Sequence, residues 1–281
     1  MTMLECAGKL LDLSQPRVMG ILNITPDSFS DGGNFFAQDQ ALKHALAMVE
    51  AGASIIDIGG ESTRPGAKEV SVADELARVI PVIEALRDIP AVISIDTSKP
   101  EVMMAAVEAG AGLINDVRAL QEPGALEAAA ALSVPVCLMH MQGQPRSMQQ
   151  APVYENVIED VYTFLAQRVE ACVEAGIERQ HLLLDPGFGF GKSLSHNLSL
   201  LAHLDRFKEL NLPLLVGMSR KSMLGAIVDK PTEQRLSAGL AVSAIAAWQG
   251  ANIIRVHDVA ETTDVIKVVT AVMEHRHNSE A

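Results

Sequence analysis

The chain has 281 residues, of which 48% are hydrophobic and 20% charged, and its formal net charge at pH 7 is −13. This length fits one large α/β domain or two small ones, and an acidic chain with no evident basic patch is not typical of a nucleic-acid binder. No apolar stretch reaches the roughly 18–20 residues of a membrane span, and residues 1–17 lack the basic and apolar parts of a signal peptide. We therefore expect a globular protein of the cytoplasm.

The cysteines also favour a reducing compartment. Cys6, Cys137 and Cys172 are odd in number and widely spaced, which argues against a disulfide framework. We expect three inert and mostly buried thiols. Cys137 and His140 stand at the spacing of a metal-binding pair, but a second pair is missing, so a zinc site is not expected.

One unit repeats about eight times along the chain, once in about 35 residues. Each unit is a short apolar run, a polar or charged tip and an amphipathic stretch. The runs are too continuously apolar for half-exposed strands and suit parallel strands that are covered on both faces. In chain order the runs are Val18–Leu22, Ser54–Ile58, Ala91–Ile95, Leu113–Ile114, Pro135–Met139, Leu182–Leu184, Leu212–Gly217 and Ile253–Val256.

The stretches between the runs carry apolar residues at helical spacing. The first, Ala41–Glu50, ends at Ala51–Gly52, where a glycine is typical of a helix C-terminus. The predicted helices are Ala41–Glu50, Val72–Arg87, Pro100–Ala109, Gly124–Leu132, Tyr154–Ala175, Leu194–Leu210, Thr232–Gln249 and Glu261–Glu274.

Strands that alternate with helices allow either a closed (β/α)8 TIM barrel or an open doubly wound sheet. The strand count, the length and the polar residues after almost every run favour the barrel, because an open sheet gathers its ligand-binding residues at one switch point. We predict a single domain over residues 1–281. Residues 1–16 precede the first strand and are expected to form a small β-hairpin over the barrel floor, and 275–281 form a polar tail that frays.

A glycine-rich segment, Asp185–Ser193, follows the sixth run. It is not a P-loop, because Pro186 stands where that pattern requires glycine, and Lys192 stands where the dinucleotide fingerprint requires one. The glycines are better explained by a tight turn that brings backbone close to a ligand. The sequence leaves open whether Phe188 and Phe190 pack inward or line an apolar pocket for a ring.

The polar tips form two chemical sets. Lys221, Arg255 and His257 are cationic or can become so, and residues two apart on a strand share a face. Together they suit a phosphate or another anion, although Arg255 alone is also explained by an ion pair inside the barrel.

The second set, Asp96, Asn115 and Asp185, has the opposite character. Buried carboxylates must be paired, and ion pairs to Lys221 and Arg255 are one explanation. The other is that they bind the donor edge of a planar heterocycle rich in N–H groups, such as a pterin or a guanine.

Two long segments, Met19–Gly33 and Asp57–Gly66, closely resemble the signatures of the dihydropteroate synthase family. The resemblance runs from about residue 10 to 270, with no departure at the signature positions. Shorter matches follow in order at Ser94–Thr97, Ile114–Asp116, Leu184–Lys192, Gly217–Ser222 and Arg255–Asp258.

The resemblance implies a folate-pathway transferase that joins p-aminobenzoate to 6-hydroxymethyl-7,8-dihydropterin diphosphate and uses Mg²⁺. By analogy, Arg255 lies on the pterin face and, with His257, meets the diphosphate, while Asn23 contacts Mg²⁺. The implied catalytic residues are Asp96, Lys221, Arg255, His257 and Arg64. The pterin is implied to be held by Asp96, Asn115, Asp185 and Lys221, and Met139 and Gly217 are further substrate-binding residues. The p-aminobenzoate pocket, which sulfonamides also occupy in this family, is implied to consist of Thr63, Arg64, Pro65, Phe190, Lys221 and Ser222. A homodimer through late helices such as Thr232–Gln249 is implied as well.

The residues suit this chemistry. Diphosphate is a good leaving group, an aryl amine needs no strong base, and no Ser–His–Asp or Cys–His pairing stands out, so positioning and electrostatics would carry the rate. We expect the loops Thr25–Phe36 and Ser62–Lys68 to be mobile lids. The alternative is a pterin-binding methyl-transfer module, which has no need of the intact Asn23–Asp27 and Ser62–Arg64 segments.

Overall fold

The structure is a computed structural model that describes residues 3–24, 33–62, 69–143 and 152–280. Its main sheet has eight strands, hydrogen-bonded in the order β8-β7-β6-β5-β4-β3-β10-β9, and the paired strands are parallel. A parallel bridge between Leu184 and Leu214 joins the two ends of this order, so the sheet closes into a barrel. The strands are β3 (Arg17–Asn23), β4 (Ile55–Gly59), β5 (Val92–Asp96), β6 (Leu113–Asp116), β7 (Val136–Met139), β8 (Leu182–Asp185), β9 (Leu215–Val216) and β10 (Ile253–Val256).

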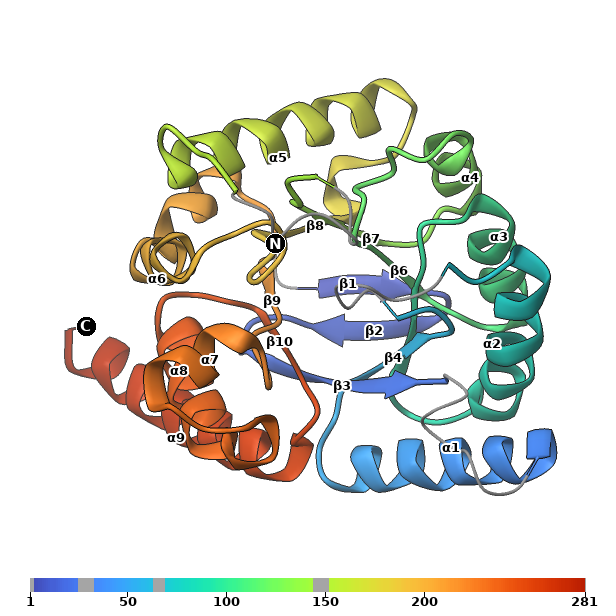
Figure 1. Cartoon of the computed structure of the whole chain (residues 1–281), viewed down its shortest axis with the longest axis horizontal. Helices are drawn as coiled ribbons and strands as arrows, with labels where there is room; N and C mark the ends of the chain where they lie inside the picture. Colours follow the sequence, from blue (N-terminus) through green and yellow to red (C-terminus); the bar gives the residue numbers. More distant parts are fainter. Residues whose placement is uncertain (1–2, 25–32, 63–68, 144–151, 281) are drawn as a thin grey trace.

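Helices surround the ring of strands (Figure 1). The predicted (β/α)8 barrel is therefore confirmed. The helices are α1 (Gly33–Glu50), α2 (Val72–Leu86), α3 (Pro100–Ala109), α4 (Ala125–Leu132), α5 (Val157–Glu174), α6 (Leu194–Ala202), α7 (Ser222–Val228), α8 (Leu236–Trp248) and α9 (Val259–Glu280).

Several helical segments differ from the prediction. Helix α1 begins at Gly33 rather than at Ala41, and the predicted helix Thr232–Gln249 begins as a 3-10 helix, Thr232–Gln234, which precedes α8. The expected helix Leu194–Leu210 is split, because His203 leaves the helical region (φ −123°) and a 3-10 helix follows from Leu204 to Leu210. The short helix α7 was not predicted. Helix α9 extends beyond the predicted end at Glu274 and continues to Glu280, through the segment expected to form a polar tail. No glycine or proline interrupts the sequence there, and Ser279 Oγ donates to the His275 carbonyl at 3.0 Å.

The amino-terminal end of the barrel is closed by the predicted hairpin. Its strands β1 (Met3–Cys6) and β2 (Lys9–Asp12) pair antiparallel, and the hairpin lies across the ring of strands in Figure 1. The contact is tight, because a Cβ added to Gly112 would lie 2.6 Å from the Cys6 carbonyl oxygen. One apolar cluster joins hairpin and strands: Leu4, Cys6, Leu11, Leu13, Met19, Ile55, Val92, Leu113, Cys137, Leu183, Leu215 and Ile253.

The strand residues in that cluster point inward, and their neighbours point outward into a second cluster with the helices. Every second residue of a strand points inward, so the next inward-pointing residues lie nearer the carboxyl ends of the strands. On β5 this series runs from Val92 through Ser94 to Asp96. The barrel interior therefore changes from apolar to polar along its axis, and the polar end positions the candidate site.

Candidate active site

An arginine inside the barrel mouth holds two buried carboxylates. Arg255 Nε lies 2.6 Å from Asp57 Oδ2, and its Nη2 lies 2.6 Å from Asp96 Oδ2. Asn115 Nδ2 donates to the same Asp57 oxygen at 3.1 Å. The ion-pair explanation of Arg255 is thus confirmed for Asp57 and Asp96. Its predicted contacts with a pterin face and a diphosphate stay predictions.

Burial has the largest influence on the pKa of Asp96. It raises the pKa of Asp96 to about 7; the Arg255 guanidinium opposes this shift, and the Asp57 carboxylate adds to it. A carboxylate held in this way is poorly solvated and gains strongly from a further N–H donor. Asp96 is therefore well suited to bind a ligand with N–H groups.

Two buried oxygens of this layer have no hydrogen-bond partner among the described residues. They are Asp57 Oδ1 and Ser94 Oγ. Buried polar atoms without a partner are uncommon in folded proteins, and at a barrel mouth they mark where a polar ligand or water belongs. The inward-facing layer of Asp57, Ser94 and Asn115 therefore has the chemistry of a binding-pocket floor.

The neighbouring side of the mouth is formed by Asp185 and Lys221. Asp185 Oδ1 accepts a hydrogen bond from Gly187 N at 2.7 Å, and burial raises the pKa of Asp185, although Lys221 opposes the shift. Burial lowers the pKa of Lys221 to about 8. Its Nζ donates to the Phe188 carbonyl and lies 4.6 Å from the centre of the Phe190 ring. The charges of Asp185 and Lys221 thus act on each other across this side of the mouth.

The two phenylalanines of the glycine-rich segment divide between the alternatives left open by the sequence. Phe188 is fully buried in the apolar cluster between strands and helices. Phe190 is half-buried and faces the Lys221 ammonium. The first is a packing residue, and the second is available to a ring at the barrel mouth.

Asn23 stands at the end of β3, beside Gly59 and Asp96. A Cβ added to Gly59 would lie 3.6 Å from Asn23 Oδ1 and 3.8 Å from Asp96 Oδ2, so both oxygens face the space over this glycine. Oxygen ligands suit Mg²⁺, which keeps several waters and is commonly shared with substrate phosphates. The described residues include no group of three or more His, Cys, Asp or Glu placed to hold a metal. Asn23 Oδ1 is thus a hard oxygen atom of the kind that Mg²⁺ prefers, and its contact with Mg²⁺ stays a prediction.

The two basic residues after β9, Arg220 and Lys221, point in different directions. Lys221 enters the mouth, whereas Arg220, in the left-handed region with φ +59°, pairs with Asp258. Ser219 Oγ lies 3.0 Å from Nδ1 of His257 and accepts a hydrogen bond from the His257 backbone N–H at 3.3 Å. Ser222 begins α7. His257 and Ser222 are thus both close in sequence to residues of the mouth.

The other predicted site residues are only partly described. Met139 ends β7 in register with Asp185, and a Cβ on Gly217 would lie 3.6 Å from Arg255 Cβ, which places both at the mouth. Thr63, Arg64 and Pro65 lie outside the described residues. Most of the two predicted lids, residues 25–32 and 63–68, also lies outside the described residues. The end of the first predicted lid, from Gly33 onward, belongs to α1.

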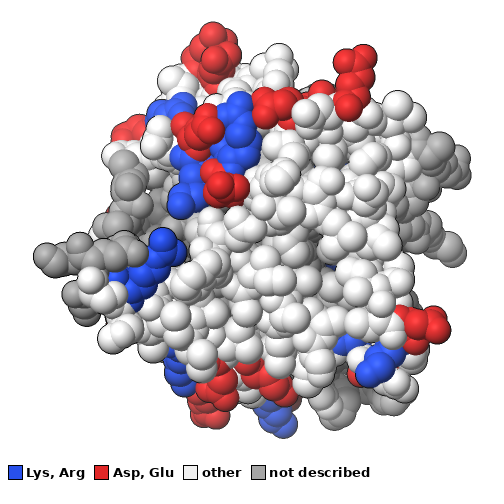
Figure 2. Space-filling view, turned by 90° about the vertical axis from the view of Figure 1, so that its left-hand side faces the viewer, with Lys and Arg blue, Asp and Glu red and all other residues white. Residues whose placement is uncertain are grey.

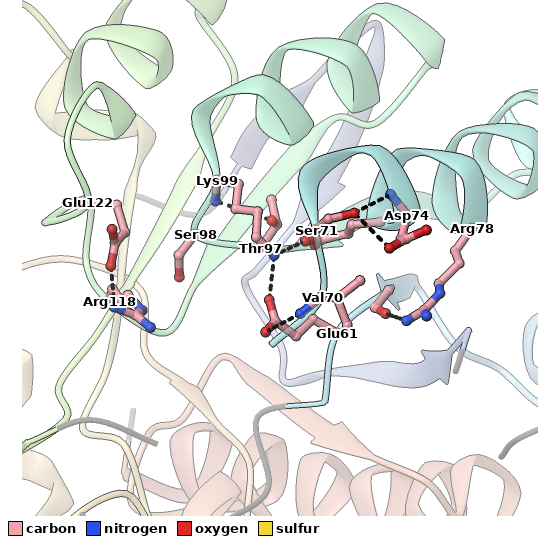
Figure 3. Close-up of polar contacts among 12 residues, drawn as sticks. Glu61, Val70, Ser71, Asp74, Arg78, Thr97, Ser98, Lys99, Arg118 and Glu122 are labelled. Carbon is pink, nitrogen blue, oxygen red and sulfur yellow. Dashed lines mark hydrogen bonds and ion pairs between the residues drawn. The ribbon is translucent and has the colours of Figure 1, made fainter. Parts of the chain in front are cut away.

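A polar network beside the mouth was missed from the sequence. Lys99 Nζ lies 2.5 Å from Glu61 Oε2 and also pairs with Glu75, which is fully buried (Figure 3). Glu61 Oε1 also accepts from Val70 N at 3.2 Å, and Arg78 donates to the Gly60 carbonyl at 2.8 Å. The network ties the segment after β4 to the starts of α2 and α3. Asp57 was not among the predicted site residues either, although the alternation of inward and outward residues along its strand could have identified it. No sequence signal pairs Lys99 with Glu75.

Comparisons with known proteins agree with this geometry. Residues 19–257 match the model of the family described as pterin binding enzyme. The chain is 59% identical to the dihydropteroate synthase of Escherichia coli strain K12 over 96% of both chains, and 57% identical to that of Haemophilus influenzae over 93% of this chain and 95% of the relative. Each relative is named as a synthase, which favours that reading over the methyl-transfer alternative.

Solved structures agree as well. A crystal structure of Yersinia pestis dihydropteroate synthase with a sulfonamide drug superposes with a TM-score of 0.93 at 57% identity, covering 97% of this chain and 99% of the other. The Xanthomonas albilineans synthase in complex with 7,8-dihydropteroate gives 0.88 at 50% identity, covering 96% of this chain and 98% of the other. The chain therefore belongs to the pterin binding enzyme family and, within it, to the dihydropteroate synthases.

Proposed function

We propose that this chain condenses 6-hydroxymethyl-7,8-dihydropterin diphosphate with p-aminobenzoate to give 7,8-dihydropteroate and diphosphate. The observation that carries the proposal is the inward-facing layer at the barrel mouth, where Asp57, Asp96, Asn115 and Asp185 are buried together. Carboxylate and amide groups there match a flat ring rich in N–H donors. Related synthases have been solved with 4-aminobenzoic acid and with 7,8-dihydropteroate.

The pterin would be held by charge-assisted hydrogen bonds. Asp96 and Asp185 supply acceptors, and Asn115 supplies both a donor and an acceptor. The Arg255 guanidinium, with Nε and Nη2 each 2.6 Å from a carboxylate oxygen of Asp57 and Asp96, holds both side chains in place and opposes the rise in the pKa of Asp96. The ring is thereby oriented with its methylene toward the open mouth.

The reaction exchanges one bond at that methylene for another. The bond to the diphosphate oxygen breaks, the bond to the amine nitrogen forms, and the amine releases a proton. The weakly basic aryl amine attacks without a strong base, so the chain contributes orientation and charge stabilisation. Lys221, Phe190 and Ser222 offer an ammonium, a ring and a hydroxyl, which suit an aryl carboxylate, and His257 is proposed to meet the diphosphate. The predicted roles of Thr63, Arg64 and Pro65 belong to the same pocket.

We propose Asn23 as the protein ligand of Mg²⁺. Its side-chain oxygen shares the space over Gly59 with Asp96, and an amide oxygen is a suitable hard ligand. When bound, the ion neutralises charge on the departing diphosphate.

The test is diphosphate release by the purified protein. We expect release that requires the pterin diphosphate, p-aminobenzoate and Mg²⁺ together, and that a sulfonamide inhibits. Omission of the aryl amine is the control for simple hydrolysis. No release with competent substrates would contradict the proposed function.

We also propose that the chain forms a homodimer through α8 and α9. Figure 2 shows that the side of the molecule carrying α7, α8 and α9 is largely free of charged residues, although the chain carries a net charge of −13. Exposed apolar residues gather on these helices, and a large uncharged face of this kind is typical of an interface between identical subunits. They are Ile227, Leu236, Ile245, Trp248, Val268 and Val272.

The oligomeric state tests this assignment. We expect a dimer by light scattering and a monomer for Trp248→Glu, because a buried charge at the interface is unfavourable. Leu46→Glu on α1 is the matched control, since Leu46 is 42% exposed and Trp248 46%. A monomeric wild-type chain, or a dimer that survives Trp248→Glu, would contradict it.

The cytoplasm is the proposed location. The three cysteines are free and buried, as expected of a protein from a reducing compartment. Among the described residues, no helix is long and apolar enough to span a membrane.

A further inference from the structure

A buried lysine that the proposed function leaves unused lies next to the candidate site. Lys192 is 3% exposed and ends the glycine-rich turn between β8 and α6. Its Nζ donates to the carbonyl oxygens of Gly187 at 2.8 Å, Phe190 at 3.1 Å and His140 at 3.3 Å, and it lies 2.9 Å from His140 Nδ1. An ammonium has three N–H donors, so these acceptors satisfy all of them.

The turn has a shape that few sequences adopt. Gly187, Gly189 and Gly191 have φ values of +73°, +79° and +62°, in the region that favours glycine. A Cβ on Gly187 would lie 1.8 Å from the His140 carbonyl oxygen, and one on Gly191 would lie 2.3 Å from that of Gln142. The turn is therefore pressed against the segment after β7, with two of its carbonyls directed at the Lys192 ammonium.

The same turn supports Lys221. Lys221 Nζ donates to the Phe188 carbonyl and lies 4.6 Å from the centre of the Phe190 ring. A Cβ on Gly189 would lie 2.9 Å from Lys221 Cδ, so the lysine side chain packs on this glycine. One short turn thus joins the buried Lys192 to the two residues proposed to bind the aryl amine.

The protonation of His140 agrees with Lys192 as the hydrogen-bond donor. Burial, aided by the nearby Lys192, lowers the pKa of His140 to about 2, so its ring is neutral and Nδ1 can accept a hydrogen bond from Lys192. Burial also lowers the pKa of Lys192, although the Asp185 carboxylate opposes the shift. The ring of His140 is held in turn by an edge contact with Phe164 at 4.9 Å.

We propose that Lys192 is a positioning residue for the aryl amine substrate. It touches no substrate, but it fixes the turn 187–191. This turn contains Phe190, and Lys221 packs against it. Without the ammonium, the carbonyls directed at it lose their donor, and the turn relaxes to satisfy them elsewhere. This inference rests on the proposed function, because Lys221 and Phe190 are its p-aminobenzoate contacts.

The experiment compares Lys192→Met with Lys9→Met. For Lys192→Met we expect the KM for p-aminobenzoate to rise roughly tenfold, with a smaller change in kcat, because the residues that orient the amine shift. Lys9 is the matched control, since its Nζ also donates to two carbonyls, those of Arg87 and Ala91 at 2.9 Å each, but at the hairpin end of the barrel. Lys9→Met should lower stability and leave both KM values unchanged.

A second variant keeps the test decisive if Lys192→Met fails to fold. His140→Phe removes one acceptor of Lys192 and retains a ring beside Phe164. It should raise the same KM by a smaller factor. A folded Lys192→Met, or failing that a folded His140→Phe, with the wild-type KM for p-aminobenzoate would overturn the inference. An equal rise in Lys9→Met would overturn it too.

Failure of this inference and failure of the proposed function give different results. If the wild-type chain releases diphosphate and the variants keep its KM, only the role of Lys192 is wrong. If the wild-type chain releases none, the proposed function is wrong. Hydrogen exchange at the amides of 187–191 then still decides whether Lys192 shapes the turn, with faster exchange expected in Lys192→Met and not in Lys9→Met.

Discussion

The two ends of the barrel interior are built from the same strands but differ in the chemistry of their inward-facing residues. At the amino-terminal end the inward residues are apolar and pack against the hairpin, as Ile55 and Val92 do with Leu4. At the carboxyl end the inward residues of the same strands are Asp57 and Asp96, which are buried and ionisable. Contacts at the first end are non-directional, whereas each polar group at the second needs a partner of matching chemistry. Stability and ligand recognition are thus separated along one axis.

The largest expected effect comes from removing the cation at the polar end. Arg255→Met leaves Asp57 and Asp96 buried without their ion-pair partner, and we expect a loss of about 3–5 kcal/mol in the free energy of unfolding. Urea denaturation measures it. Arg206→Met is the control, because its ion pair with Glu159 at 2.9 Å lies at the surface, where solvent screens the charges and the pair should contribute far less. Equal losses in the free energy of unfolding would show that the buried ion pairs at the polar end stabilise the fold no more than a surface ion pair does.

The apolar end should respond in stability alone. Leu4 is 2% exposed, and Leu4→Ala should reduce the free energy of unfolding by about 2–4 kcal/mol through lost burial and a cavity. Because the site lies at the other end, kcat and both KM values should not change in the folded fraction. A changed KM for the pterin substrate would break the proposed separation.

A charge change at the polar end should respond in binding instead. Asp185→Asn keeps an oxygen that can accept from Gly187 N, and we expect pterin affinity to fall by about 1–3 kcal/mol from the lost charge. Calorimetric titration measures this, with Asp12→Asn in the hairpin as the control. Asp12 pairs with Arg17 at 3.2 Å, far along the axis from the site. Undiminished affinity in Asp185→Asn would assign this carboxylate a structural role.

The smallest effect is a pH dependence at Lys221. Burial lowers the pKa of Lys221 from 10.5 to about 8, so the ammonium is charged below that pH and neutral above it. The KM for anionic p-aminobenzoate should therefore rise as the pH increases through about 8. The same shift means that Lys221 destabilises the folded chain at lower pH, and that this penalty fades between about pH 8 and 10.5.

Lys221→Arg separates this effect from other titrations. Arginine keeps its charge throughout this range, so the rise in KM above pH 8 should disappear even if the overall affinity changes. A rise that persists in the arginine variant would assign the titration to another group.

The sequence was sufficient for the architecture because apolar runs and their spacing record strand burial directly. The hairpin, the strand order and the face of the site follow from this pattern. The end of α9 did not, because a polar sequence without glycine or proline is compatible with both helix and coil.

The site was predictable only as a set of residue types. Asp96, Asn115 and Asp185 were identified by following apolar runs, but their partners were not, since Arg255 meets Asp57 across 198 positions of sequence. The Lys192 contacts depend on three glycines with positive φ, and no linear pattern states where their carbonyls point. Side-chain pairing across the barrel is a property of the closed sheet rather than of any segment.

The most direct test of this division is a calorimetric titration of the pterin diphosphate into three proteins. The wild-type chain and Leu4→Ala should bind it with the same affinity, and Asp96→Ala should lose at least about tenfold, because a buried acceptor is removed while Asp57 still holds Arg255. Undiminished binding by Asp96→Ala, or an equal loss in Leu4→Ala, would contradict the claim that the polar end alone recognises the pterin.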